Sequence, residues 1–299
     1  MANNIFVIGY YGYDNIGDDA MQQGLSEIFK YRTYGDLRFY HKGQSLIKGF
    51  LWADDIVLGG GTHLRDWGKG WLKQSARILL LGLISKLSGK DFYMFNVGIE
   101  SSWLGLLAHC ISDEITIRDE NSFDSSVVLN YEPKIKQKIL GISLTPYYKL
   151  FYNDENKDSL LANNLMEKVK KWLLFHKDWN VVFFNFNKSD EGLNFYASTL
   201  IDNAEVRLFK KNVVNVLQDI SECSAFIGMR YHSSMFAYIT ETPMVIIDTY
   251  PSCSKLSGFI GANLITKEKI LNGNFELDFV KAKLSVATAK SLAFGGVKL

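Results

Sequence analysis

Short apolar runs alternate with helical patterns along almost the whole chain, and this alternation constrains the fold most. The first apolar run, Asn4 to Gly9, ends in glycine and precedes a helical pattern over residues 18–31. Further runs at 56–58, 92–97 and 115–117 alternate with helical patterns at 70–88, 103–111 and 119–128. Strand alternating with helix is typical of a parallel sheet covered by helices. We therefore predict an α/β fold.

A polar break near residues 130–138 contains the first proline and divides the pattern in two. Beyond it we predict strands at 139–144, 181–186, 206–209, 225–227 and 244–247, and helices at 158–176, 190–201, 213–222, 232–239 and 277–292. The prediction is two doubly wound Rossmann-like domains, 1–135 and 136–299, with a central ligand cleft facing the carboxyl ends of both sheets. We consider that the last helix folds back onto the first domain.

Composition excludes several classes of protein. With 33 basic and 32 acidic residues in 299, the formal charge of +1 lacks the basic footprint of a nucleic-acid-binding protein. The three cysteines contain no CxxC pair, which argues against a disulfide framework or a cysteine zinc site, and no ligand cluster suggests another metal. The amino terminus lacks the features of a signal peptide. We expect a soluble, cytoplasmic protein without a metal.

The longest apolar run, residues 78–84, is far shorter than the ~20 residues that a membrane span needs. It lies in a stretch, Trp71 to Lys90, that also contains several lysines. We interpret this stretch as a helix packed on the core. A peripheral contact with a membrane is the alternative interpretation.

The loop between the first strand and the first helix reads GYYGYDNIGDDA from Gly9 to Ala20. It lacks the GxGxxG of a dinucleotide site, and acidic residues so near a helix start would repel a pyrophosphate. Asp14, Asn15 and Asp18 supply hydrogen-bond acceptors that suit sugar hydroxyls. A polar site for an acceptor is favoured over a simple turn in which Asp18 caps the helix.

A second motif, GGGTHLRD, follows the apolar run 56–58. Glycines there expose backbone amides at the carboxyl edge of the sheet, where open α/β folds bind ligands. His63, Arg65 and Asp66 follow at once, so Gly60 and Gly61 are predicted to line a site. The alternative is a turn that uses glycine only for packing.

A third motif, ITIRDENS, places Arg118 at the end of an apolar run. Taken alone, an arginine in this position is more often a surface ion pair than a ligand-binding residue.

The strongest local signal is AFIGMRYHSSMFA, residues 225–237. A buried strand is predicted to end at Gly228, with Arg230 and His232 at the start of an apolar helix. An imidazole in this position can act as an acid or base, and Ser233 with neighbouring backbone amides can hold an anion.

The next apolar run leads into a segment with Asp248, Tyr250 and Lys255, which we interpret as a loop rich in serine and glycine. Lys255 would share the sheet edge with His232. Two cations and a base opposite a face rich in acceptors suit a small anionic donor and a polyol acceptor.

Five motifs together resemble the polysaccharide pyruvyl transferase family. They are GYYGYDNIGDDA, GGGTHLRD, ITIRDENS, GMRYHSSMFA and DTYPSCSKLSGF, they follow the family's order, and they span residues 9–258. The pair GYxGxxNxGDDA and GMRxH is the specific part of the resemblance. The glycine triplet is not specific.

The resemblance implies a two-domain fold of the GT-B type and transfer of a pyruvyl group from phosphoenolpyruvate to a sugar, forming a ketal without a further cofactor. It places Arg118, His232 and Lys255 on the donor side, with His232 as acid/base, and Asp14, Asn15 and Asp18 on the acceptor side. The first domain then takes the acceptor and the second the donor. From their positions in the motifs, Arg230 and Ser233 are predicted to belong to the donor site. The residues of the second motif predicted to belong to the acceptor site are Gly60, Gly61, Arg65 and Asp66.

Two residues depart from the family pattern, because Arg65 stands where the family often has glutamine and His63 is not usual there. Both bear on the acceptor, which we expect to be a sugar or a lipid-linked oligosaccharide. With a lipid-linked acceptor, the protein would act in the cytoplasm at the inner face of the membrane. Two other interpretations stay open, a nucleotide-sugar glycosyltransferase of GT-B type and a non-catalytic carbohydrate-binding assembly protein.

Overall fold

The computed structural model describes residues 3–30, 35–64, 66, 71–117 and 122–295. The chain forms two compact units. The first contains residues 1–13, 18–129 and 287–299, and the second contains residues 14–17 and 130–286. The boundary expected after residue 135 falls instead after residue 129, and the short segment 14–17 groups with the second unit.

The first unit is built on a six-stranded parallel sheet in the order β2-β1-β3-β5-β4, with β6 also paired to β5. Its strands are β1 (Ile5–Tyr11), β2 (Leu37–His41), β3 (Asp55–Gly59), β4 (Thr62–Leu64), β5 (Asp91–Ile99) and β6 (Glu114–Ile117). Every residue of β3 is buried. A strand buried on both faces is expected inside a parallel sheet with helices on either side.

Helices cover both faces of this sheet. They are α1 (Ile16–Phe29), α2 (Leu46–Trp52), α3 (Trp71–Leu87), α4 (Ser102–Ile111), the 3₁₀ helix η1 (Ser125–Val128) and α12 (Val286–Gly295). One core cluster joins Phe6 and Phe92 of the sheet to Ile78 of α3 and Leu104 of α4. Gly49 of α2 approaches the Phe6 ring, so α2, α3 and α4 form one layer. Leu25 of α1 packs near Gly59 on the other face.

Three features of the first unit and its returning helix differ from the sequence prediction. In place of a helix over 119–128, whose first residues lie outside the described part, the structure has η1, whose start is capped by Asp124 at the Ser126 amide. The last helix begins at Val286 rather than at 277, because the preceding residues run irregularly and Val280 pairs with Met244. Strand β2 and helix α2 were not predicted.

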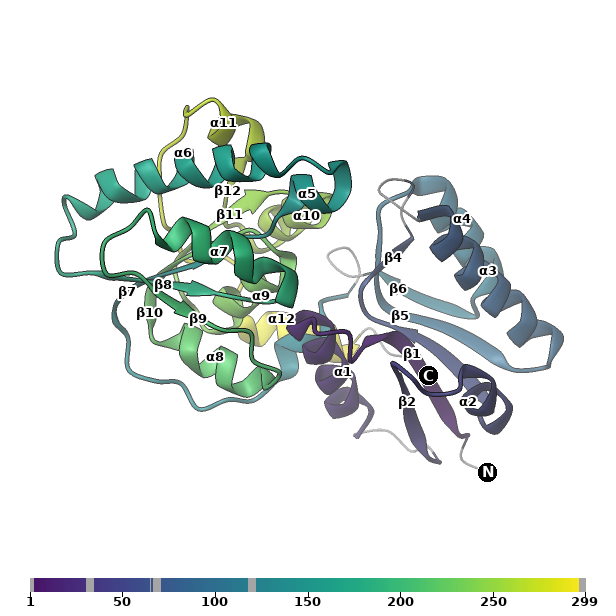
Figure 1. The fold of residues 1–299 in the computed structure, drawn as a ribbon. Helices are drawn as coiled ribbons and strands as arrows, with labels where there is room; N and C mark the ends of the chain where they lie inside the picture. Colours follow the sequence, from purple (N-terminus) through teal and green to yellow (C-terminus); the bar gives the residue numbers. More distant parts are fainter. Residues whose placement is uncertain (1–2, 31–34, 65, 67–70, 118–121, 296–299) are drawn as a thin grey trace. The chain divides into compact units, whose positions relative to one another are not determined.

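The second unit contains a six-stranded parallel sheet in the order β12-β11-β10-β7-β8-β9 (Figure 1). Its strands are β7 (Gln137–Ser143), β8 (Asn180–Phe184), β9 (Glu205–Arg207), β10 (Cys223–Gly228), β11 (Met244–Asp248) and β12 (Asn263–Thr266). Its helices are α5 (Tyr147–Tyr152), α6 (Glu155–Leu173), η2 (Lys188–Asp190), α7 (Glu191–Ser198), α8 (Val213–Ser221), α9 (Tyr231–Ile239), α10 (Pro251–Ile260) and α11 (Lys267–Leu271). The order of strands and helices is that of a doubly wound α/β domain.

The segment expected to be a serine- and glycine-rich loop after β11 is helix α10. Pro251 occupies its first turn, where a missing amide hydrogen costs nothing. Gly261 ends the helix in the left-handed region at φ 69°. Lys255 therefore lies on a helix, in its second turn, and not on a flexible loop.

Candidate active site

The connection from β10 to α9 forms the centre of the candidate site. Gly228 ends β10 so close to the helix that a Cβ atom there would lie 2.4 Å from the Ser234 Oγ. The Ser233 hydroxyl accepts a hydrogen bond from the Arg230 amide at 3.1 Å and donates one to the Arg230 carbonyl at 2.8 Å. Ser233 is fully buried in this cap, and its role in binding the pyruvyl donor stays a prediction.

Arg230 is held by an ion pair that the sequence analysis did not foresee. Its Nε donates to Asp190 Oδ2 at 2.7 Å and its Nη2 to Asp190 Oδ1 at 2.6 Å. The Asp190 side chain is fully buried and that of Arg230 is 16% exposed. This two-pronged pair orients the guanidinium. A role in donor binding stays a prediction for Arg230.

His232 is the second residue of α9 and lies against Gly17 of the amino-terminal loop. A Cβ atom on Gly17 would stand 2.2 Å from the His232 Nδ1. The imidazole also meets the Tyr231 ring edge-on, with ring centroids 5.1 Å apart. Glycine at position 17 therefore provides the space that the imidazole occupies. The two motifs that carry the family resemblance meet at this contact.

The loop segment 14–17 is tied to the connection that follows β8. The Ile16 amide donates to the Phe186 carbonyl at 3.0 Å, and Asn15 forms a β-bridge with Asn187. Asp14 adopts a left-handed backbone at φ 56°. Its half-exposed carboxylate pairs with Lys211 at 2.9 Å. The structure thus brings Asp14 and Asn15 to the same unit as His232, and their acceptor role stays a prediction.

Helix α10 begins at the carboxyl end of β11, the strand next to β10. Asp248 accepts a hydrogen bond from Ser254 at 2.7 Å at the start of this helix. Tyr250, the residue just before α10, is partly buried; burial raises the pKa of its hydroxyl, and the nearby Arg230 charge works against that increase. The amino termini of α9 and α10, which favour anions, thus follow neighbouring strands, with half-exposed Lys255 on α10.

The other predicted acceptor residues belong to the first unit. Gly60 and Gly61 have positive φ of 60° and 83°, are buried, and pack on Met21 of α1; the Gly61 amide lies 3.1 Å from the Met21 sulfur. This contact favours the packing interpretation for both glycines. Asp18 is buried in the first turn of α1. Asp66 is exposed, and Arg65 and Arg118 lie outside the described residues.

Four residues that the sequence analysis did not select help to build these loops: Asp190, Asn187, Lys211 and Asp19. Asn187 and Asp190 form a capping box, and the Asp190 carboxylate also accepts from the Asn187 amide at 3.0 Å. Asp19 accepts from the Gly12 amide at 2.9 Å, where Gly12 has a φ of 75°. The spacing of Asn187 and Asp190 before a helix was a readable signal, whereas Lys211 had none.

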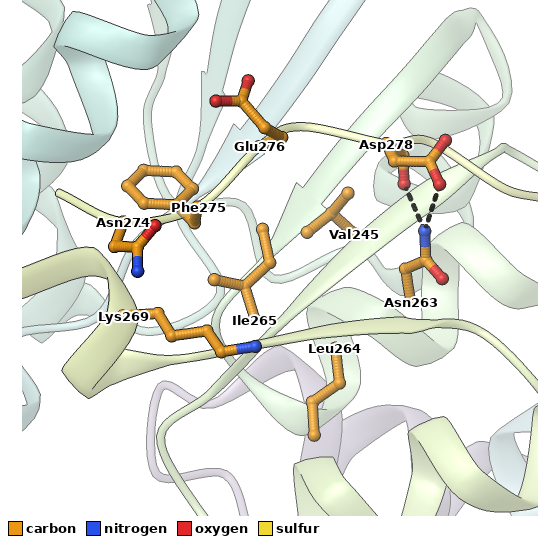
Figure 2. A pocket seen from close by; sticks show the side chains of 9 residues that line it. All are labelled: Val245, Asn263, Leu264, Ile265, Lys269, Asn274, Phe275, Glu276 and Asp278. Carbon is orange, nitrogen blue, oxygen red and sulfur yellow. Dashed lines mark hydrogen bonds between the residues drawn. The ribbon is translucent and has the colours of Figure 1, made fainter.

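A small pocket of about 190 Å³ opens beside the edge strand β12, between α11 and the segment 274–278 (Figure 2). Asn263 donates there to the backbone and side-chain oxygens of Asp278 at 2.8 and 2.9 Å. None of the predicted site residues lines it. Its volume is below the ~300 Å³ typical of small-molecule sites, so we do not assign the reaction to it.

Among the described residues, no group of three His, Cys, Asp or Glu side chains is arranged to hold a metal ion. No helix in that part of the chain has both the length and the apolar character of a membrane span.

Solved structures similar to this chain in fold include UDP-GlcNAc 2-epimerases. The chain is similar to the UDP-GlcNAc 2-epimerase of Methanocaldococcus jannaschii, solved with UDP-GlcNAc and UDP (TM-score 0.58, 10% identity, 96% of this chain and 97% of that one). It is also similar to a putative UDP-N-acetylglucosamine 2-epimerase of Listeria monocytogenes (TM-score 0.55, 10% identity, 91% and 87%). The predicted class, two Rossmann-like domains of GT-B type, is confirmed. A central cleft stays a prediction.

The family is established by sequence. The model of the polysaccharide pyruvyl transferase family matches residues 15–250, and the chain belongs to this family. No curated protein sequence matches the chain. The match begins within the amino-terminal motif and ends at Tyr250, so it includes residues 15–20 of that motif and the whole of the motif that contains His232.

Proposed function

We propose that the protein transfers a pyruvyl group from phosphoenolpyruvate to a sugar of a cell-surface polysaccharide or of its precursor, forming a ketal. The observation that carries the proposal is the contact of Gly17 with His232 in a chain of this family. It places the only histidine of the family motifs GYxGxxNxGDDA and GMRxH beside a loop of hydrogen-bond acceptors.

The proposed reaction joins two hydroxyls of one sugar to the central carbon of the donor. Proton transfer to the methylene carbon of phosphoenolpyruvate makes a methyl group and leaves a cationic centre at the adjacent carbon. One hydroxyl loses its proton and attacks that centre. The carbon–oxygen bond to phosphate then breaks, a second hydroxyl closes the ketal ring, and its proton leaves with phosphate. The overall reaction converts donor and diol into ketal and inorganic phosphate.

His232 is proposed to transfer the proton, because it stands at the start of α9 beside the loop 14–17. Lys255 and Arg118 are proposed to bind the carboxylate and phosphate of the donor. Arg230 is held by Asp190 and can add its charge from a fixed position. Asp14, Asn15 and Asp18 are proposed to receive hydrogen bonds from the sugar; Asp14 would exchange part of its pairing with Lys211.

The direct test is incubation of the protein with phosphoenolpyruvate and a panel of sugar acceptors, free and lipid-linked. We expect release of inorganic phosphate that requires the acceptor, and a product heavier by one pyruvyl ketal in the mass spectrum. Release of a nucleotide from UDP-sugars, without phosphate from phosphoenolpyruvate, would support a glycosyltransferase. Sugar binding with no turnover of either donor would support a carbohydrate-binding assembly protein.

The role of His232 is tested by its replacement. His232→Ala is expected to lower turnover by ~10²–10⁴-fold, the range for loss of an acid/base group. Donor affinity should fall less, since Lys255 and Arg118 still bind the charges. His232→Asn should bind the donor better than the alanine variant and react no faster, because it cannot carry a proton.

His109→Ala is the matched control, since His109 is exposed on α4 and lies outside every motif. Its turnover should equal that of the wild type. A His232→Ala protein that retained more than about a tenth of the turnover would contradict the acid/base role. Equal losses of melting temperature and donor affinity in both His232 variants would assign this residue a structural role.

A further inference from the structure

Helices α3 and α4 of the first unit expose an apolar surface on the side that faces away from their own sheet. On α3 the exposed side chains include Leu80, Leu83 and Leu87, and on α4 they include Trp103 and Leu106. Leu87 is 80% exposed and Leu106 is 70% exposed. The two helices lie side by side (Figure 1), and Trp71 meets Trp103 edge-on at 6.4 Å near their amino ends. We call this surface the α3–α4 face.

Helix α3 buries mostly small residues and leaves several of its large apolar side chains exposed. The residues that it buries are Ser75, Ile78, Gly82 and Ser85, and three of these four are small. A Cβ on Gly82 would lie 2.9 Å from the Phe92 ring, so the helix needs a small residue there to approach the sheet. Leu79 and Leu81 also pack against the core, but the exposed Leu80, Leu83 and Leu87 do not serve it. Exposed apolar surface of this extent marks an interaction site.

Charge on the α3–α4 face has one sign. Helix α3 contains Lys73, Arg77 and Lys86 and no acidic residue, and α4 contains neither acidic residues nor lysine or arginine. Lys73 and Arg77 are one helical turn apart and exposed, beside the row of leucines. Lys86 lies 3.6 Å from Asp113, beyond the end of α4.

We propose that the α3–α4 face binds the surface of a membrane that contains anionic lipids. Leucine and tryptophan side chains would enter the boundary between headgroups and acyl chains, while Lys73 and Arg77 stay at the level of the phosphates. A second copy of the chain fits this surface less well. A symmetric contact would place the positive charge of this face on both sides of the interface, with no acid on either helix to offset it.

The proposal is independent of the reaction and is tested without substrates. The full chain is mixed with vesicles of phosphatidylcholine alone or of phosphatidylcholine with phosphatidylglycerol, and bound protein is measured by sedimentation. We expect binding to the anionic vesicles that weakens as salt is added. Leu83→Glu combined with Leu106→Glu should weaken that binding about tenfold or more, because two apolar contacts become charged.

Two further variants separate the apolar and the electrostatic contributions. Lys73→Glu with Arg77→Glu should abolish the preference for phosphatidylglycerol. Phe175→Glu with Leu208→Glu, two exposed apolar residues of the second unit, should bind as the wild type does. Circular dichroism and melting temperature verify that each variant is folded.

Three results would overturn the proposal. They are failure of the wild type to bind either vesicle, equal binding by the Leu83→Glu/Leu106→Glu variant, and a concentration-dependent dimer in sedimentation that the same variant abolishes. The last result would assign the face to a second copy of the chain. Loss of phosphate release with normal vesicle binding would contradict only the proposed reaction.

Discussion

Strands β3 and β10 both end in glycine at the carboxyl edge of a parallel sheet, yet the two edges are built differently. At β3, Gly59 lies against Leu25 and Tyr11, and the next two glycines pack on Met21. At β10, Gly228 lies against the hydroxyls of Ser233 and Ser234. The first edge is filled mainly by apolar side chains of α1. The second is occupied by polar groups that start a helix and place His232.

The comparison shows that glycine after an apolar run is an ambiguous signal. In both places the missing Cβ permits close approach of a helix. The two edges differ in the residues of the approaching helix. These residues are Met21 and Leu25 at the β3 edge, and Ser233 and Ser234 at the β10 edge. A chemical site is indicated only where the approaching residues are polar. The following predictions test whether the first edge serves stability and the second serves the reaction.

The largest effect is expected from the ion pair at the second edge. Asp190→Asn leaves the guanidinium of Arg230 mostly buried without its charge partner, and loss of one member of a buried pair costs about 3–5 kcal/mol. Urea unfolding at neutral pH measures the loss. Asp178→Asn, which removes an exposed partner of Lys138, should leave stability nearly unchanged. Equal stability of the Asp190→Asn protein and the wild type would mean that this pair does not hold the edge.

At the first edge, Gly59→Ala should lower the free energy of unfolding by about 1–3 kcal/mol, because the new methyl group overpacks a full core. Its Cβ would lie 2.7 Å from Leu25 and 2.8 Å from Val7. Turnover per folded molecule should not change. Gly192→Ala is the matched control, since no atom lies near that position. A large loss of turnover with normal stability would place the reaction at this edge.

Gly17→Ala should lower turnover more than stability, whereas Gly59→Ala should lower stability and leave turnover unchanged. The methyl group would occupy the position of the His232 imidazole. Displacement of a reacting group by about 1 Å can cost up to about a hundredfold in rate, and we expect about a tenfold loss here. The loss of stability should be the smaller of the two effects, because alanine is favourable within α1. Steady-state kinetics and thermal unfolding of the same sample separate the two. Unchanged turnover would show that the position of His232 is not critical.

The smallest effect concerns one tyrosine at each edge, the buried Tyr11 and the partly buried Tyr250. Burial raises the pKa of Tyr11 well above its usual range, and the Asp18 and Asp124 charges raise it further. At Tyr250, burial raises the pKa while Arg230 and Thr145 oppose the increase. A raised pKa contributes stability that is complete below the unfolded pKa of ~10 and is lost as the pH rises through the folded pKa.

Stability should therefore fall above pH ~10. Tyr11→Phe also removes the 2.7 Å hydrogen bond to the Gly59 carbonyl, at a cost of about 1 kcal/mol at neutral pH. The Tyr11→Phe substitution should reduce the loss of stability at alkaline pH more than Tyr250→Phe does. Melting temperatures measured from neutral pH into this alkaline range decide the point. A larger reduction of this alkaline loss in Tyr250→Phe would show that Tyr250, and not Tyr11, contributes more to the pH dependence of stability.

The sequence by itself determined the class of fold and the family. Periodicity is a local property, so strands such as β3 and β10, and helices such as α1 and α9, were predictable from their own residues. The motifs containing Gly17 and His232 were recognisable for the same reason. Elements with weaker patterns, such as β2 and α2, were not predicted, and the Lys255 segment was wrongly read as a loop because its serines obscured α10.

Only the tertiary structure decided which residues meet. Arg230 carried no sign that Asp190 would bind it, since the two belong to different connections of the sheet. Gly17 carried no sign that it makes room for His232. The sequence of α3 likewise did not show that Ser75, Gly82 and Ser85 would be buried while Leu80, Leu83 and Leu87 are exposed. These contacts arise from the order of strands in the sheets and from the close approach of helices. Both depend on packing between segments far apart in the chain, which no local pattern records.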